Sequence, residues 1–188
     1  MLISVRKASE GDLKAVSRIY SQVQAMHVEW RPDIYKPNDD LPGRERFLEL
    51  AESGLLYVAA VAEEGMPADP GRIEPDRTDP DRTEPAGACS PEAYAGPVTA
   101  GVLELQLRHI ENPAQVTRDV IFVDTMAVDE AYRGRGIGRA FFEFLKRMRD
   151  EGGYDGIELQ VNARNRAAYD MYTHCGFREK SINMELVE

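Results

Sequence analysis

The order of apolar and polar side chains divides the first 63 residues into four elements. Residues 2–8 alternate between apolar and polar, which is typical of a half-buried strand. Apolar residues then recur at helical spacing over 13–23, after a capping box formed by Ser9 and Asp12. A second helical stretch and a continuous apolar run follow, so the predicted order is strand, helix, helix, strand, at 2–8, 13–23, 42–53 and 55–63.

Residues 64–96 interrupt this pattern. They contain a five-residue repeat that begins with Arg72-Ile-Glu-Pro-Asp, and a proline in every unit excludes a helix or a central strand. The composition predicts a solvated insertion in a loop, and the alternative is a mobile arm that covers a substrate or contacts a partner. The chain is accordingly predicted to be one domain, 1–188, with this insertion inside it.

The second half returns to regular alternation of strands and helices. Two strands separated by a polar connection predict a hairpin, and the strand–helix–strand order around 120–162 predicts a right-handed crossover. The last helix is predicted to end at Gly176, with one or two closing strands after it. The predicted elements are strands at 97–108, 118–128, 156–163 and within 179–188, and helices from the turn to 152 or 153 and at 164–177.

A glycine-rich turn links the strand that ends at Val128 to the helix that contains Phe141. Free backbone N–H groups at such a turn, at the positive end of the helix dipole, favour an anion, and glycine lets that anion approach the backbone. From Arg133 to Arg149 there are six basic residues and one acidic residue, in a chain whose net charge is −10. This local positive charge predicts a polyphosphate ligand.

Two common phosphate-binding patterns do not fit this turn. A P-loop needs Gly-Lys-Ser/Thr where this chain has Gly138-Arg139-Ala140, and a dinucleotide fingerprint needs glycine where it has Arg139. A third pattern, R/QxxGxG/A, is matched by Arg133, Gly136 and Gly138. On that match, segment 126–145 resembles the acetyl-CoA-binding core of the GNAT N-acetyltransferases.

A second signature of the same family lies downstream at the expected separation. Asn165, Ala168, Tyr172, Gly176 and Phe177 match it, and the similarity extends over nearly the whole chain except 64–96. The resemblance implies an α/β fold (α+β in some schemes), the GNAT fold, with a mixed, largely antiparallel sheet flanked by about four helices.

The resemblance also implies how acetyl-CoA would bind as co-substrate. Backbone groups of the strand before the turn would pair with the pantetheine arm, the turn amides would hold the pyrophosphate, and Asn165 would contact the arm. Tyr172 would protonate the departing thiolate, since a phenol is protonated at neutral pH. The implied cofactor-binding residues are Met126, Ala127, Val128, Arg133, Gly134, Arg135, Gly136, Ile137, Gly138, Arg139 and Asn165.

The general base is predicted to be a carboxylate, acting directly or through water. Asp124 matches a position where many relatives carry an acidic residue, and simple alternation would place it on one face with Met126 and Val128. A structural aspartate at the strand edge is an equal alternative, and Glu104 is a second candidate base. Relatives that acetylate protein N-termini often carry glutamate where this chain has Gln160, which cannot be a base.

The predicted function is transfer of the acetyl group of acetyl-CoA to a primary amine of a small molecule or peptide, by direct attack in a ternary complex. Alternatives are an acyl-CoA-binding sensor or scaffold with the same fold, and an enzyme that uses a longer acyl-CoA. The acceptor pocket is expected near the loop after the first helix, which offers His27, Glu29, Trp30 and Tyr35.

Charge and composition narrow the predicted partners. A net charge of −10 argues against nucleic-acid and anionic-membrane binding, and no apolar run reaches the length of a spanning helix. Two distant cysteines and three scattered histidines predict no metal site and suit a reducing, cytoplasmic location. The sequence leaves a homodimer open.

Overall fold

The computed structural model describes residues 1–62 and 96–186, so the predicted insertion lies outside the described residues apart from Gly96. Within these residues, five strands form one sheet in the order β1-β2-β3-β4-β5. Neighbouring strands are antiparallel from β1 to β4, and β5 is parallel to β4, which confirms the mixed, largely antiparallel sheet. The strands are β1 (Leu2–Lys7), β2 (Leu56–Ala62), β3 (Val98–Ile110), β4 (Arg118–Val128) and β5 (Gly156–Leu159).

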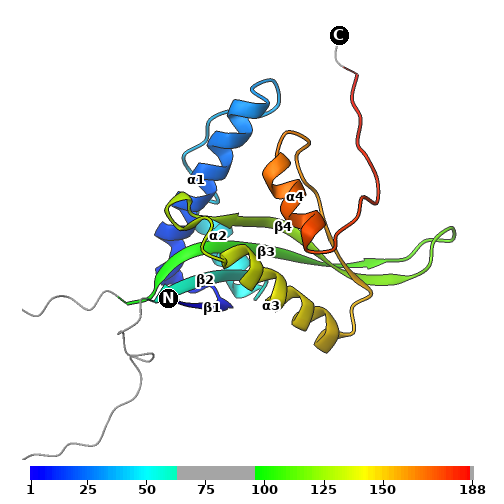
Figure 1. Cartoon of the computed structure of the whole chain (residues 1–188), viewed down its shortest axis with the longest axis horizontal. Helices are drawn as coiled ribbons and strands as arrows, with labels where there is room; N and C mark the ends of the chain where they lie inside the picture. The colour runs from blue at the N-terminus through cyan, green and yellow to red at the C-terminus, as the bar shows by residue number, and fades with distance from the viewer. Residues whose placement is uncertain (63–95, 187–188) are drawn as a thin grey trace, which may run out of the picture.

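Four α-helices flank this sheet, as predicted. In Figure 1, α3 crosses in front of the strands and α2 lies behind them, while α4 lies above β4. The helices are α1 (Leu13–Trp30), α2 (Arg44–Glu52), α3 (Ile137–Gly152) and α4 (Arg166–His174), with short 3₁₀ turns at η1 (Glu10–Asp12) and η2 (Glu130–Tyr132).

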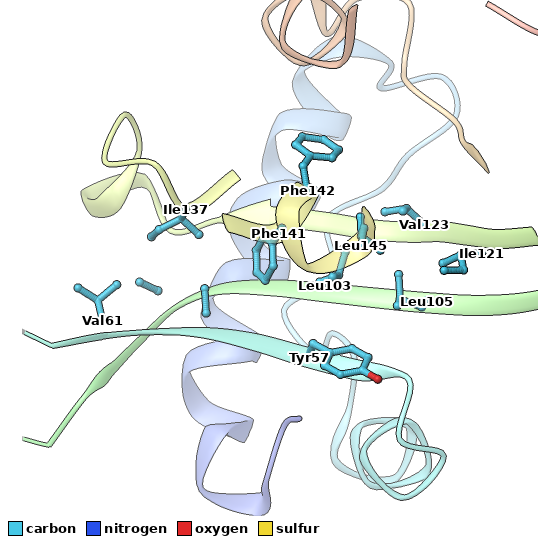
Figure 2. Close-up of a cluster of buried hydrophobic side chains, with 12 residues drawn as sticks. Tyr57, Val61, Leu103, Leu105, Ile121, Val123, Ile137, Phe141, Phe142 and Leu145 are labelled. Carbon is cyan, nitrogen blue, oxygen red and sulfur yellow. The ribbon is translucent and has the colours of Figure 1, made fainter. Parts of the chain in front are cut away.

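The face of the sheet under α3 is covered by apolar side chains. Phe141 and Leu145 of α3 are fully buried against β3 and β4, as Figure 2 shows. At Gly101 of β3, an added Cβ would lie 2.9 Å from both Ile137 Cγ2 and Phe141 Cε2. The absence of a side chain at this glycine therefore lets α3 lie directly on the backbone of β3.

The opposite face packs on α1 and α2 and also contains buried charge. Val16, Ile19 and Phe47 are fully buried there. Asp12, at the start of α1, is buried too and accepts hydrogen bonds from Arg6 (2.8 and 2.9 Å) and Thr99 (2.5 Å). Its carboxylate also accepts from the Ser9 N–H at 2.9 Å, which is the predicted capping-box contact.

The end of the described chain differs from its prediction. Residues 178–186 form neither helix nor strand, and Ile182, Met184 and Leu186 are 72%, 91% and 97% exposed. This segment is held instead by side-chain ion pairs, from Lys180 to Glu158 and from Glu185 to Arg31. The closing strand is therefore wrong for 179–186, because no backbone ladder joins the segment to β5 in the part of the chain that the structure describes.

Candidate active site

The sheet opens between β4 and β5. The two strands pair only where Val120–Val123 lie beside Gly156–Leu159, so β5 is shorter than the predicted 156–163. β4 continues to Val128 with β3 on one side. Along its other edge, Met126, Ala127 and Val128 have no partner strand among the described residues. Their outward backbone groups can therefore pair with an extended ligand that enters the opening.

A β-bulge marks the point where the opening begins. Glu104 lies opposite Thr125 and Leu105 lies opposite Val123, which leaves Asp124 as the extra residue of β4. Val123 and Met126 both pack in the core under α3 although they are three residues apart. The expected alternation of Asp124 with Met126 and Val128 is therefore wrong, because the bulge turns Asp124 toward the α1 and α2 face.

The glycine-rich turn lies at the start of α3. Gly134 and Gly136 have φ angles of 75° and 89°, which only glycine adopts without strain, and Gly136 is the N-cap of α3. No side chain caps this helix. The first amides of the helix, from Ile137 to Arg139, have no acceptor within the helix, so an anion can bind them at the positive end of the dipole.

Contacts with α1 hold the approach to this turn in place. Asp129 is buried and accepts from Arg18 Nε of α1 at 2.7 Å and from the Ala131 N–H at 3.0 Å. Burial alone would raise the pKa of Asp129, but these hydrogen bonds outweigh it and lower the pKa. The Glu130 N–H donates to Gln22 Oε1, also on α1, at 3.0 Å. The turn is thereby fixed relative to α1 before any ligand binds.

Helix α4 brings Tyr172 to the α3 side of the opening. Its ring contacts Phe142 and Phe177 edge to face, with centroids 5.9 Å apart in both pairs. No described residue forms a hydrogen bond with the Tyr172 hydroxyl, and burial raises its pKa. The phenol is therefore protonated at neutral pH and free to donate to a ligand.

Asn165 has a local structural role. It is the N-cap of α4, and its side-chain oxygen accepts from the Ala168 N–H at 3.2 Å. This contact uses the carbonyl oxygen and leaves the side-chain NH₂ group available as a donor. The same residue can thus start α4 and donate to a ligand beside it.

Two carboxylates lie on the other face of the sheet, near the bulge. Asp124 is exposed, and its Oδ1 accepts from Gln106 Nε2 at 2.9 Å. Glu104 is only 5% exposed and accepts from the Tyr20 hydroxyl at 2.5 Å and from Arg46 Nη2 at 3.3 Å. Burial, followed by the charge of Glu104, raises the pKa of Tyr20, so Tyr20 stays protonated and donates to Glu104.

Tyr20 and Arg46 were not among the candidates from sequence. Tyr20 falls in the helical apolar repeat of α1, where it has the spacing of a core residue, and Arg46 falls in a run of charged residues on α2. Both are brought to Glu104 from helices far away in sequence. The available signal in the sequence was Glu104 itself. A charged residue in the middle of an apolar strand needs polar partners if it is buried.

The residues expected at the acceptor pocket lie at the end of α1. His27 stacks on Tyr35 with ring centroids 4.7 Å apart and lies 5.8 Å from the Trp30 ring. Burial lowers the pKa of His27. Glu29 is exposed, as is Gln160 just beyond the end of β5. The three rings form one aromatic group, while Glu29 and Gln160 face solvent.

Comparison with known proteins identifies the family to which this chain belongs. The model of the acetyltransferase (GNAT) family matches residues 59–177, which is more than half of the chain. The chain belongs to the GNAT acetyltransferase family. The opening between β4 and β5, the turn before α3 and Tyr172 all lie within the matched stretch.

Individual relatives match over shorter stretches. The [ribosomal protein bS18]-alanine N-acetyltransferase of Escherichia coli K12 is 37% identical over 68 residues, which cover 36% of this chain and 46% of that enzyme. An uncharacterized N-acetyltransferase of Methanocaldococcus jannaschii is 34% identical over 65 residues, or 29% of its length. The matched part of the chain thus spans less than half of these relatives.

Solved structures share the fold over the whole chain. The BH1408 protein from Bacillus halodurans, solved as a tetramutant, has a TM-score of 0.76 and 24% identity, with both chains fully covered. AAC(6')-Iy, solved with the bisubstrate analogue CoA-S-monomethyl-acetylneamine, has a TM-score of 0.60 and 12% identity over the full length of both chains. These likenesses show the GNAT fold.

No helix within 1–62 or 96–186 combines the length and apolar character needed to cross a bilayer. Within the same ranges, no group of three or more His, Cys, Asp or Glu side chains is arranged to hold a metal ion.

Proposed function

We propose that this protein transfers the acetyl group of acetyl-CoA to a primary amine by direct attack in a ternary complex. The observation that carries the proposal is the opening between β4 and β5. It has free helix amides at one end, Tyr172 on the α3 side and Asp124 on the α1 side. An amine can thus approach a bound thioester from one face while its leaving group is protonated from the other.

The residues around the opening fit acetyl-CoA. The pyrophosphate would bind the amides from Ile137 to Arg139, with Arg133, Arg135 and Arg139 supplying positive charge. The pantetheine arm would run along the free edge of Met126, Ala127 and Val128, as an added strand. The Asn165 side-chain NH₂ group would donate to the same arm.

Proton transfers occur at both reacting atoms. The ammonium loses one proton toward Asp124, the neutral amine attacks the thioester carbonyl carbon, and a C–N bond forms as the C–S bond breaks. The thiolate takes a proton from the Tyr172 hydroxyl, and the phenolate regains one through water as the new amide nitrogen loses its second proton. We favour Asp124 over Glu104 as the base because Asp124 is exposed and has one neutral partner, whereas Tyr20 and Arg46 already occupy Glu104.

The acceptor would enter between the end of α1 and the bulge of β4. The names of the compared proteins indicate two chemically different acceptors, an alanine of ribosomal protein bS18 and an aminoglycoside. Gln160 gives no support to a peptide N-terminus, so the test needs both classes. A suitable panel holds an alanine-terminated peptide, a lysine peptide, a polyamine and an aminoglycoside.

The first experiment tests cofactor binding by calorimetry. Arg139→Glu places negative charge beside the first amides of α3 and should weaken CoA binding at least about tenfold. Lys146→Glu is the matched control, because it makes the same charge change two turns further along α3 and should leave affinity nearly unchanged. Equal CoA affinity in all three proteins would place the phosphate site elsewhere. Gly136 is a poor test position, since its φ of 89° strains any other residue.

The second experiment tests catalysis, by free-thiol release from acetyl-CoA across the amine panel. With the best acceptor, Tyr172→Phe keeps the ring contacts and should lower kcat by about 10²- to 10⁴-fold, with CoA affinity unchanged. Asp124→Asn should lower kcat/KM, because the amide cannot accept the proton of the amine. Thiol release that no amine stimulates, in a protein that binds CoA, would support an acyl-CoA sensor instead.

A further inference from the structure

A cavity lies along the C-terminal half of α3, away from the glycine-rich turn. Its volume is about 640 Å³, within the range of about 300–1,000 Å³ that is common for small-molecule sites. Tyr57, Phe144, Met148 and Tyr154 form its wall, and Arg147 and Glu151 of α3 also line it. From Gly138 to Arg147 the helix rises about 14 Å, so a ligand here is separate from the amides at the start of α3.

The wall of this cavity is aromatic, with two phenol groups. The Tyr57 and Phe144 ring centroids are 4.6 Å apart at an angle of 52°. Tyr154 folds over Gly152, where an added Cβ would lie 2.3 Å from its Cε2 atom. Within residues 1–62 and 96–186, neither phenol oxygen has a hydrogen-bond partner. The cavity therefore offers ring faces for packing and two free hydroxyls.

The charged residues of the cavity are also without partners. Arg147 and Glu151 are four residues apart on α3, a spacing at which opposite charges often pair. Neither forms an ion pair or a hydrogen bond with any residue in the described part of the chain. Their neighbours on the helix do pair, Lys146 with Glu143 and Arg149 with Asp150. One cation and one anion thus face the same cavity without neutralising each other.

We propose that this cavity binds a free aromatic amino acid as its zwitterion. The carboxylate would pair with Arg147 and the ammonium with Glu151, while the ring packs among Tyr57, Phe144 and Tyr154. A purely anionic ligand would be repelled by Glu151, and a purely cationic one by Arg147. A zwitterion satisfies both charges, and its aromatic side chain matches the wall.

Calorimetry of L-phenylalanine and L-tyrosine against the CoA-saturated protein tests this site without any acetyl transfer. For ligands of this size we expect a Kd of about 0.1–1 mM. Arg147→Ala and Glu151→Gln should each weaken binding at least about tenfold. Lys146→Ala is the control on the same helix and should bind like the parent. Thermal unfolding of each variant checks that it folds.

Truncated ligands assign each charge to its partner. N-acetyl-L-phenylalanine lacks the ammonium, so its affinity should be low and should rise in Glu151→Gln, which removes the repelling charge. 2-Phenylethylamine lacks the carboxylate, so its affinity should likewise be low and should rise in Arg147→Ala. Absence of binding at 10-fold above the expected Kd range, or binding that survives both Arg147→Ala and Glu151→Gln, would overturn the proposal. Displacement by CoA would do so too, because it would place the amino acid in the transferase site.

Discussion

The two faces of the sheet are stabilised by different interactions. Under α3, twelve buried apolar residues form one cluster, and the helix lies directly on the backbone of Gly101. Under α1 and α2 the apolar cluster is smaller. All four buried polar or charged residues in the described chain have their partners on this second side: Asp12, Thr99, Glu104 and Asp129.

The α3 side of the sheet is therefore held rigid by apolar packing, whereas the α1 and α2 side contains the groups that respond to protonation. Apolar packing is insensitive to pH and fixes α3, whose first turn is the proposed phosphate site. Buried carboxylates with specific donors are costly to disturb and respond to protonation, and they lie on the side from which the acceptor would approach. The α3 side of the sheet, which carries the proposed phosphate site, is thus held by shape, and the α1 side, from which the acceptor would approach, is held by charge.

The largest expected effect is on the apolar face. Phe141→Ala removes a fully buried ring and should lower the free energy of unfolding by about 3–5 kcal/mol at any pH near neutrality. Leu107→Ala, on the exposed part of β3, is the control and should cost well under half of that. Urea unfolding monitored by circular dichroism measures both. Equal losses would show that the α3 face is not the main apolar core.

The next effect concerns Asp12 and depends on pH. Burial would raise its pKa, but the hydrogen bonds from Arg6, Thr99 and Ser9 outweigh it and hold the pKa far below its ordinary value. A lowered pKa in the folded state stabilises the protein above the unfolded pKa of about 4, and this stability is lost as the pH falls below it.

Asp12→Asn should therefore cost about 2 kcal/mol at pH 7, and its unfolding free energy should fall less than that of the parent between about pH 5 and pH 3. Asp150→Asn, on the exposed surface of α3, should leave both the stability and its pH profile unchanged. If the unfolding free energy of Asp12→Asn fell with pH as steeply as that of the parent, the acid sensitivity would come from other carboxylates.

The smallest effect is expected at Tyr20. Tyr20→Phe keeps the ring, removes one donor from Glu104 and leaves Arg46 in place, so it should cost about 1 kcal/mol. Tyr35→Phe, on the loop after α1, removes a hydroxyl from a ring that stacks on His27 and serves as the control. A loss above 3 kcal/mol would mean that Arg46 does not hold Glu104 by itself.

What could be predicted from sequence depended on local patterns. Periodicity indicated the order of strands and helices. The glycines at 134 and 136 indicated a turn, and the structure gives both of them positive φ angles, which other residues adopt only with strain. The resemblance to the GNAT family then identified the region of the opening. These features need only neighbouring residues to be recognised.

The features that were missed depend on pairing between distant segments. Nothing in residues 118–128 marks Asp124 as a bulge, because the register with β3 alone creates it. Tyr20 has the spacing of a core residue, and only the fold places it against Glu104. Residues 179–186 alternate like a strand, yet alternation cannot show whether a neighbouring strand is available.

Hydrogen–deuterium exchange can be followed at the uncapped start of α3. Backbone N–H groups without an internal acceptor exchange their hydrogen for deuterium quickly, whereas the fully bonded amides around Phe141 and Leu145 exchange only when the helix opens. A phosphate seated on the amides of Ile137, Gly138 and Arg139 would slow just these three. Their exchange rates would then report occupancy of the site by CoA in the absence of any acceptor, residue by residue within a single helix.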